Sequence, residues 1–330
     1  MSKIKESPLF WPAHLKGNVL YVLDETLIPA KVKYIAVKNT REAVKVIRTM
    51  KTRAFGQFLV VLNTFSVEIK NAEATGRSPL QAKLLKRIEF TAAALNASRP
   101  TFPFAEVTGI VVGWARKALA EGKDVAAVVG KNIEGYLQGI RYRRLERVQK
   151  IAALFEDGDR VLTHCNVSGE LAMAAAVSKG RGKRVRFFAT ETRPYLQGAK
   201  LTAWELQKAG VPVTLIADNA IGVLLSGGLV SKVIIGSDRS CANGDVANKI
   251  SSYQIAVVAK EFGVPLYVLT QPSAGIKRGE DIPIEVRDPR EILFYEGRRV
   301  CPARVEGFYP GFDVVPHELI TESIAIHAGA

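Results

Sequence analysis

The spacing of apolar residues first predicts short strands and then helices. Two β-type runs, at 19–23 and 32–37, lie on either side of a turn at Pro29. Apolar residues then recur every three or four positions, which is typical of amphipathic helices. These helical stretches cover 39–51, 80–96, 107–120 and 125 to about 156. The N-terminal part of the chain is therefore predicted to be mostly helical.

After Gly158 the pattern becomes an alternation of strands and helices. Predicted strands occupy 161–163, 185–189, 213–216, 233–235 and 266–269, and the helices between them occupy 169–179, 196–209, 220–225 and 251–261. Such an alternation predicts βαβ units and a doubly wound parallel sheet. We therefore predict an α/β protein with a mostly helical N-terminal domain, residues 1–125, and a Rossmann-like parallel-sheet C-terminal domain, residues 126–330. A helix that spans both domains would place the boundary anywhere within 122–158.

The positive charge is confined to the N-terminal half. The formal net charge is +14, and residues 1–150 hold 26 Lys and Arg against 12 Asp and Glu, whereas residues 151–330 hold 20 of each. Three explanations of this positive charge are possible in principle. It can serve solubility or heat adaptation, it can attract a phosphorylated small molecule, or it can bind nucleic acid. We do not expect nucleic acid, because no basic stripe interleaved with aromatic residues accompanies the charge. Four arginines form a basic run in the last predicted helix of this half, and we expect them to be a solvated helix face. They are Arg141, Arg143, Arg144 and Arg147.

Cysteine content and hydropathy indicate a cytoplasmic protein. The three cysteines, Cys165, Cys241 and Cys301, are too few and too far apart for a disulfide framework. No apolar stretch is long enough for a transmembrane helix, and the N-terminus does not read as a secretory signal. We therefore expect no membrane association.

Polar clusters follow four of the predicted strands. They are His164-Cys165-Asn166, Thr190–Arg193, Asp218-Asn219 and Ser237-Asp238-Arg239. Because parallel strands end at one edge of the sheet, where ligands of such folds bind, these clusters predict a functional site.

The known cofactor and metal motifs are absent from the sequence. It contains no strand-linked GxGxxG, Walker A, HExxH, CxxC or GxSxG motif, and its four histidines are scattered. No cofactor and no metal are therefore expected. A thiol and a carboxyl group in one pocket, here Cys165 and Asp238, can act as base and acid. Alternatively, Cys165 is a buried filler and Asp238 a helix cap.

The motifs around these residues resemble the 5-methylthioribose-1-phosphate isomerase family. They occur in matching order: THCN at 163–166, ETRP at 191–194, QGAKLTAWEL at 197–206, GSDRSCANGDVANKISSYQIA at 236–256 and FDVVPHELIT at 312–321. Archaeal ribose-1,5-bisphosphate isomerase and the α, β and δ subunits of translation initiation factor 2B belong to the same family. The resemblance also implies a homodimer.

Site residues are carried over by matching position. Cys165 matches the family's catalytic cysteine and Asp238 its catalytic aspartate. Substrate and phosphate contacts are implied at Arg53, Arg99, Gln197, Asn248 and Lys249. Two arginines and a lysine suit a phosphate group, because guanidinium forks grip its oxygens and an ammonium adds a point charge.

The resemblance implies conversion of an aldose 1-phosphate to the ketose 1-phosphate. The phosphate on C1 locks the sugar ring, so an acid must protonate the ring oxygen. We assign Asp238 as this acid and later proton donor, and Cys165 as the base at C2, with a hydride shift as the alternative. The expected substrate is 5-methylthioribose 1-phosphate; the alternatives are ribose 1,5-bisphosphate, 5-deoxyribose 1-phosphate, and a non-catalytic regulatory role.

Two segments depart from the family pattern. Residues 53–58 read RAFGQF where the isomerases have RGAPAIG, and Phe55 is bulky where the family is small. Residues 166–170 read NVSGE instead of a run of small residues. Phe55 favours an apolar substituent at C5 of the sugar if it lines the pocket.

Overall fold

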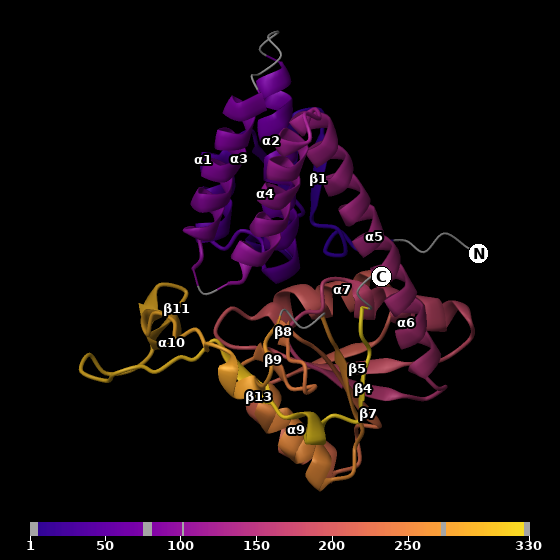
Figure 1. Ribbon diagram of the computed structural model, residues 1–330. Coiled ribbons are helices and arrows are strands. Elements are labelled where there is room, and N and C mark those ends of the chain that lie inside the picture. The colour runs from indigo at the N-terminus through magenta and orange to yellow at the C-terminus, as the bar shows by residue number, and fades with distance from the viewer. Residues whose placement is uncertain (1–5, 75–80, 101, 272–274, 327–330) are drawn as a thin grey trace. The chain divides into compact units, whose positions relative to one another are not determined.

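The structure consists of two units joined by one helix. This computed structural model describes residues 6–74, 81–100, 102–271 and 275–326 (Figure 1). The N-terminal unit is Pro8–Tyr142, and the C-terminal unit runs from Arg143 to the end of the chain and includes Glu6 and Ser7. The division lies after Tyr142 rather than between 125 and 126, because helix α5 (Val125–Leu154) continues through the expected boundary.

The N-terminal unit combines a small antiparallel sheet with helices. Its strands, in the order β1-β2-β3, are Ala13–Lys16, Val19–Leu23 and Tyr34–Val37. A 3-10 turn, Glu25–Leu27, follows β2. The helices are α1 (Thr40–Arg48), α2 (Ala54–Glu73), α3 (Gln81–Asn96), α4 (Phe104–Ala120) and the first part of α5. These elements enclose one apolar core.

Helix α2 was not predicted from the sequence. Thirteen of its 20 residues are buried, including four consecutive residues from Leu59 to Leu62. A helix that is apolar on all sides has no amphipathic period. Helix α2 could not be identified from sequence periodicity because it lies at the centre of the core.

The C-terminal unit is built on a six-stranded parallel sheet, as predicted. Its order is β14-β10-β7-β4-β5-β6, and each neighbouring pair is parallel. Counted along the chain, this is the 3-2-1-4-5-6 order of a doubly wound sheet. The strands are β4 (Arg160–Thr163), β5 (Arg186–Thr190), β6 (Val213–Ile216), β7 (Lys232–Gly236), β10 (Leu266–Leu269) and β14 (Glu322–Ser323).

Helices and short segments complete this unit. The helices are α6 (Glu170–Gly180), the π-helix η2 (Gly198–Thr202), α7 (Ala203–Lys208), α8 (Ile221–Ser226), α9 (Ser252–Glu261) and α10 (Arg290–Leu293). The 3-10 turns are η3 (Asp218–Ala220), η4 (Gly279–Asp281) and η5 (His317–Leu319). A second sheet, in the order β13-β9-β8, contains Phe312–Val315, Val246–Lys249 and Arg239–Ser240.

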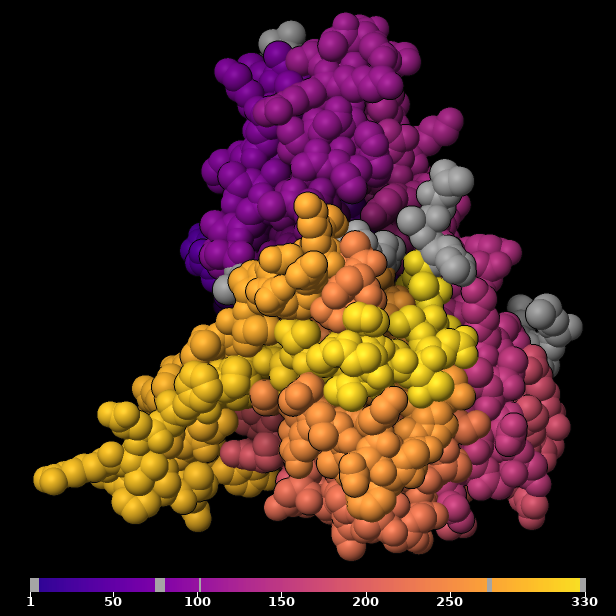
Figure 2. All heavy atoms as spheres, turned by 60° about the horizontal axis from the view of Figure 1, so that its bottom comes forward, coloured from indigo at the N-terminus to yellow at the C-terminus, as the bar shows by residue number. Residues whose placement is uncertain are grey.

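A hairpin formed by β11 (Phe294–Tyr295) and β12 (Arg298–Arg299) completes the fold. Figure 2 shows the gold segment around this hairpin standing out from the rest of its unit. No helix in the described part of the chain combines the length and hydropathy that a membrane span needs.

The basic run in α5 is only partly a solvated face. Arg144 and Arg147 are 2% and 4% exposed. The expectation that all four arginines face solvent was therefore wrong for these two. Their side chains turn toward the start of α6, where a buried carboxylate receives both.

Candidate active site

The two candidate catalytic residues follow the two central strands of the parallel sheet. Cys165 lies two residues after β4, and Asp238 lies two residues after β7. Strands β4 and β7 are neighbours, and the connections leave them in opposite directions. This is the topological switch point, where the carboxyl ends of the strands border a crevice that binds ligands in such sheets. Both side chains are half-buried.

The backbone at Cys165 is held in an unusual conformation. Its φ is +61°, in the left-handed region that residues with a Cβ rarely adopt. The Cys165 N–H donates to Thr192 Oγ1 at 3.0 Å, and the Cys165 carbonyl accepts from Thr202 Oγ1 at 2.5 Å. Asn166 donates to Thr202 Oγ1 and to Glu205 Oε2, at 3.0 and 2.7 Å. The surrounding elements thus fix the direction in which the thiol points.

His164 supports this turn from the core and is neutral. Its Nε2 lies 2.9 Å from the carbonyl of Ile250, and its Nδ1 lies 2.6 Å from Thr190 Oγ1. A carbonyl only accepts, so Nε2 carries the proton and Nδ1 accepts from the threonine hydroxyl. Burial lowers the pKa of His164 to about 4. His164 therefore connects β4, β5 and the start of α9 without carrying charge.

The loop after β5 is fixed by Asp218. Its carboxylate accepts the backbone N–H groups of Thr192 and Arg193, each at 2.7 Å. The Arg193 guanidinium lies over the Tyr295 ring, 5.1 Å from its centroid. The hydrogen bond between Arg193 and Asp218 therefore uses the Arg193 backbone and not its guanidinium group. This holds Thr192, with φ +63°, where its hydroxyl accepts from Cys165.

Gln197 and Asn248 are buried polar side chains near the same strand ends. Gln197 is 3% exposed, and its Oε1 has no hydrogen-bond partner among the described residues. The next residue, Gly198, lies so close to β5 that an added Cβ would approach the Thr190 carbonyl to 1.8 Å. Asn248 is 4% exposed and donates to Ser252 Oγ at 2.8 Å. A buried amide oxygen without a partner costs free energy, which is expected where a ligand completes it.

Lys249 is a buried cation surrounded by aromatic rings. Its Nζ lies 5.0 Å from the Phe312 centroid, 5.6 Å from that of Tyr195 and 5.9 Å from that of Tyr309. It also donates to the Tyr309 hydroxyl at 3.4 Å. Sequence reasoning missed Tyr195, which directly follows the ETRP motif, and Tyr309, which lies three residues before the FDVVPHELIT motif.

Arg53 and Arg99 lie together at the N-terminus of α2, in the N-terminal unit. Arg53 is the N-cap residue of α2, and Arg99 donates from Nη1 to Gln57 Oε1 in the first turn, at 3.0 Å. The N-terminus of a helix offers backbone N–H groups and a positive dipole end to an anion. Two guanidinium groups beside it add the donors that suit a phosphate group.

A buried acid lies beneath this helix terminus. Glu25 is 6% exposed, and its Oε1 accepts from Thr52 Oγ1 at 2.5 Å and from the Arg53 N–H at 3.3 Å. Burial raises the pKa of Glu25 to about 7, against the lowering effect of Thr52 and Arg53. Gly56 is required here, because an added Cβ would come within 1.8 Å of Thr52 Oγ1.

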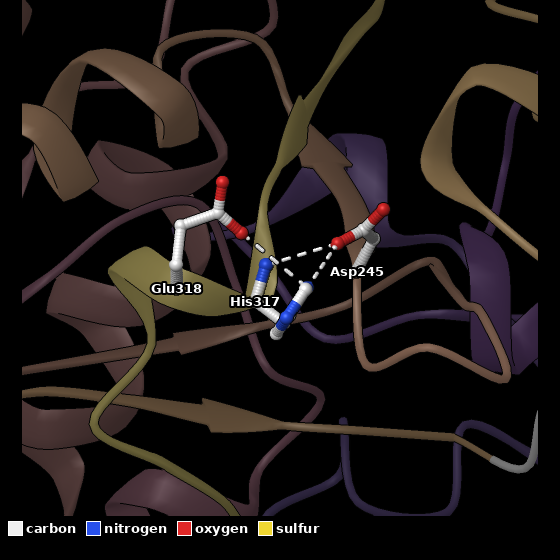
Figure 3. A group of neighbouring side chains, drawn as sticks. All are labelled: Asp245, His317 and Glu318. Atoms are coloured by element: carbon white, nitrogen blue, oxygen red, sulfur yellow. Dashed lines mark hydrogen bonds and ion pairs between the residues drawn. The ribbon is translucent and has the colours of Figure 1, made fainter.

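One group in the described residues has the composition of a cation site. Ligand atoms of Asp245, His317 and Glu318 lie within 4.8 Å of one another (Figure 3). Asp245 already accepts from Asn243 Nδ2 at 2.7 Å, and from the backbone and Nδ1 of His317 at 2.9 and 3.0 Å. Burial alone would raise the pKa of Asp245, but these bonds lower it overall. These hydrogen bonds therefore connect the loop of Asp245 to the loop of His317.

The structure thus places the predicted site residues in two clusters, one in each unit. Around the switch point lie Cys165, Asp238, Gln197, Asn248 and Lys249; at the start of α2 lie Arg53 and Arg99. The first cluster has a thiol, a carboxyl, amides and an ammonium, which suit proton transfer and the binding of a polar anion.

Comparison with known proteins gives a consistent assignment. The Initiation factor 2 subunit family matches residues 57–326. A methylthioribose-1-phosphate isomerase from Desulforudis audaxviator is 37% identical, over 96% of this chain and 92% of that protein. A 5-deoxyribose 1-phosphate isomerase from Moorella thermoacetica is 36% identical, over 96% and 92%.

Solved structures agree in fold. The 5-methylthioribose 1-phosphate isomerase from Pyrococcus horikoshii OT3 matches with a TM-score of 0.82 and 28% identity, over 98% of this chain and 94% of that one. The delta subunit of translation initiation factor eIF-2B from A. fulgidus matches with a TM-score of 0.80 and 30% identity, over 96% and 94%.

Proposed function

Because the chain belongs to the Initiation factor 2 subunit family, we propose that it shares the chemistry of its isomerase relatives and converts a pentose 1-phosphate from aldose to ketose. The observation that carries this proposal is the placement of Cys165 and Asp238 after neighbouring strands at the switch point. A purely regulatory sugar-phosphate binder needs no acid–base pair there.

The residues divide the reaction between them. Asp238 donates a proton to the ring oxygen as the bond from C1 to that oxygen breaks. Cys165, as the thiolate, removes the C2 proton to give an enol phosphate, and the resulting thiol, whose proton exchanges with water, donates a proton to C1. Asp238 recovers a proton from the C2 hydroxyl as the ketone forms, so the sugar gains and loses no atoms. Retention of a C2 deuterium at C1 would instead support a hydride shift.

Each unit, taken by itself, offers cationic groups that suit an anion. In the C-terminal unit Lys249 supplies a buried ammonium, and in the N-terminal unit Arg53 and Arg99 supply guanidinium groups at the start of α2. Gln197 Oε1 has an open acceptor position that a sugar hydroxyl can fill. Binding of an anion through both arginine forks and the helix terminus would be favoured in a water-poor site.

An apolar substituent at C5 of the sugar is favoured over a second phosphate. Phe55 follows Arg53 by two residues, and its ring packs 5.6 Å from Trp11 and 6.0 Å from Phe58. Apolar rings suit a methylthio or methyl group better than a second phosphate, whose charge would have to be desolvated beside them. We therefore propose 5-methylthioribose 1-phosphate as the substrate, with 5-deoxyribose 1-phosphate as the closest alternative.

The test is a turnover panel. The protein is incubated with 5-methylthioribose 1-phosphate, 5-deoxyribose 1-phosphate, ribose 1-phosphate and ribose 1,5-bisphosphate, and ketose formation is followed by NMR. Cys165→Ser should abolish turnover, whereas Cys301→Ser, at another half-buried free cysteine, should not. If no sugar turns over while phosphosugars still bind, the regulatory function replaces the isomerase.

We also propose a cytoplasmic homodimer, as the resemblance implies. None of the three cysteines, all of which lie in the described residues, forms a disulfide, and this suits a reducing compartment. Light scattering coupled to gel filtration should give twice the chain mass of 36.0 kDa.

A further inference from the structure

A buried ion cluster connects α5 to the turn that carries Cys165. Glu170, in the first turn of α6, accepts from Arg144 Nε at 2.5 Å, and from Arg147 Nε and Nη2 at 2.5 and 2.8 Å. The three side chains are 1%, 2% and 4% exposed, in the order Glu170, Arg144, Arg147. Both carboxylate oxygens are used, so one acid satisfies two guanidinium forks.

The same arginines hold the backbone at the edge of the sheet. Arg144 Nη2 donates to the carbonyl of Ser168 at 2.8 Å, and Arg147 Nη1 donates to that of Thr270 at 2.6 Å. Ser168 lies three residues after Cys165, and Thr270 directly follows β10. The cluster therefore joins α5 to two of the loops that border the crevice.

The turn between Cys165 and α6 needs such support. Three of its residues have positive φ angles: +61° at Cys165, +50° at Ser168 and +84° at Gly169. For residues with a Cβ this conformation is strained, so it persists only where surrounding contacts impose it. From one side Asn166 Oδ1 accepts from the Ser168 N–H at 2.9 Å; from the other, Arg144 holds the Ser168 carbonyl.

The cluster holds two buried cations and one buried anion. Burial alone would raise the pKa of Glu170, but Arg147 and Arg144 lower it below its usual value, so the carboxylate stays ionised. If Glu170 is made neutral, two buried guanidinium groups lose their shared counter-ion. The two guanidinium groups must then find other hydrogen-bond acceptors. We expect this rearrangement to move the loops whose carbonyls they bind.

We propose that Glu170, together with Arg144 and Arg147, is a set of positioning residues that sets the placement of the Cys165 thiol. This rests on the proposed isomerase function. It also explains the second departure from the family pattern: the run that reads NVSGE ends in a glutamate because α5 supplies two arginines to receive it.

The experiment needs a matched buried ion pair that lies away from the crevice. Asp159 and Lys232 form one, with Oδ2 to Nζ at 2.7 Å and exposures of 5% and 9%. Asp159 precedes β4 and Lys232 begins β7, so this pair lies at the amino edge of the same two strands. Asp159→Asn therefore removes a comparable buried charge without touching the Cys165 turn.

Two readouts are measured for wild type, Glu170→Gln, Glu170→Asp and Asp159→Asn. The first is the rate at which iodoacetamide alkylates Cys165 as a function of pH, followed by mass spectrometry of its peptide. The second is kcat and KM on the substrate identified by the turnover panel. Alkylation requires no turnover, so it tests positioning even if the isomerase assignment fails.

We expect both Glu170 variants to lower kcat about tenfold to a hundredfold with KM within about threefold, because a small displacement of a reacting group lowers the rate steeply. In the same two variants, the dependence of the Cys165 alkylation rate on pH should differ from that of wild type. Asp159→Asn should lose stability and leave both readouts unchanged. If Asp159→Asn matches Glu170→Gln, or if the Glu170 variants alkylate and turn over as wild type does, the proposal is wrong.

Arg144→Lys covers the case in which Glu170→Gln fails to fold. It keeps the charge and loses the fork that reaches the Ser168 carbonyl. An unchanged alkylation profile in a folded Arg144→Lys protein would equally overturn the proposal.

Discussion

Replacing Glu25 by glutamine should stabilise the protein at neutral and alkaline pH but not in acid. Glu25 is buried beneath the first turn of α2, where its Oε1 accepts from Thr52 and from the Arg53 N–H. Burial raises its pKa from 4.5 to about 7. Glutamine keeps the accepting oxygen and the size of the side chain, and never takes a charge.

The magnitude follows from the linkage between protonation and folding. Below pH 4.5 the folded and unfolded states both hold the Glu25 proton, and its favourable contribution is fully present. Between pH 4.5 and about 7 the unfolded chain releases the proton while the folded protein keeps it, so stability is lost as the pH rises. A shift of this size corresponds to about 3 kcal/mol, and above pH 7 this is the advantage expected for Glu25→Gln.

The assay is urea unfolding of wild type and Glu25→Gln from pH 4.5 to 9, followed by tryptophan fluorescence. The difference in the free energy of unfolding should grow with pH and level off above 7. Glu261→Gln, at an exposed carboxylate that ends α9, is the control and should show no such trend. A difference between wild type and Glu25→Gln that does not depend on pH would refute the reasoning.

Three further predictions concern packing, the phosphate and the histidine. Gly198→Ala should lower stability by about 2 kcal/mol or more and reduce kcat, because its Cβ would meet the Thr190 carbonyl; Gly222→Ala, where nothing lies within 4 Å, should be neutral or stabilising in the same thermal melts. Arg99→Lys should raise KM about tenfold with a smaller change in kcat, because it loses the fork but keeps the charge; an unchanged KM would remove Arg99 from the phosphate site. His164→Leu should destabilise the protein by about 2 kcal/mol, because the Ile250 carbonyl loses its side-chain donor and the Thr190 hydroxyl keeps only its contact with Thr192 Oγ1; equal midpoints in urea would contradict this role.

Most elements could be predicted from sequence because one side packs on a core and the other faces solvent. This difference produces a regular apolar pattern along the chain. Helix α1 shows a capping residue, Asn39, whose side chain accepts from the Glu42 N–H at 3.0 Å, and strands β4 to β7 are short apolar runs between turns. Helix α2 could not be predicted in this way, since burial on all sides removes the periodicity that identifies a helix.

Sequence patterns located the candidate site residues at strand ends, but not the contacts that hold these residues in place. Cys165 and Asp238 were found from motifs at strand ends, and the sheet order then explains why they belong together. The buried character of Arg144 and Arg147 was missed because a run of arginines reads as a solvated face. Only the lone carboxylate Glu170, in an otherwise apolar start of α6, offered a signal that cations must reach it.

The strand order also determines when the proposed acid–base pair comes into existence. Strand β7 pairs with β4, yet β5 and β6 lie between them in the chain. Contacts between residues so distant in sequence form slowly, because a long loop must close first. During synthesis the Cys165 turn is made well before Asp238, so a nascent chain carries the thiol for some time without its acid. Folding of the sheet centre is therefore the step that creates the catalytic pair, and a thiol probe at Cys165 would report its completion.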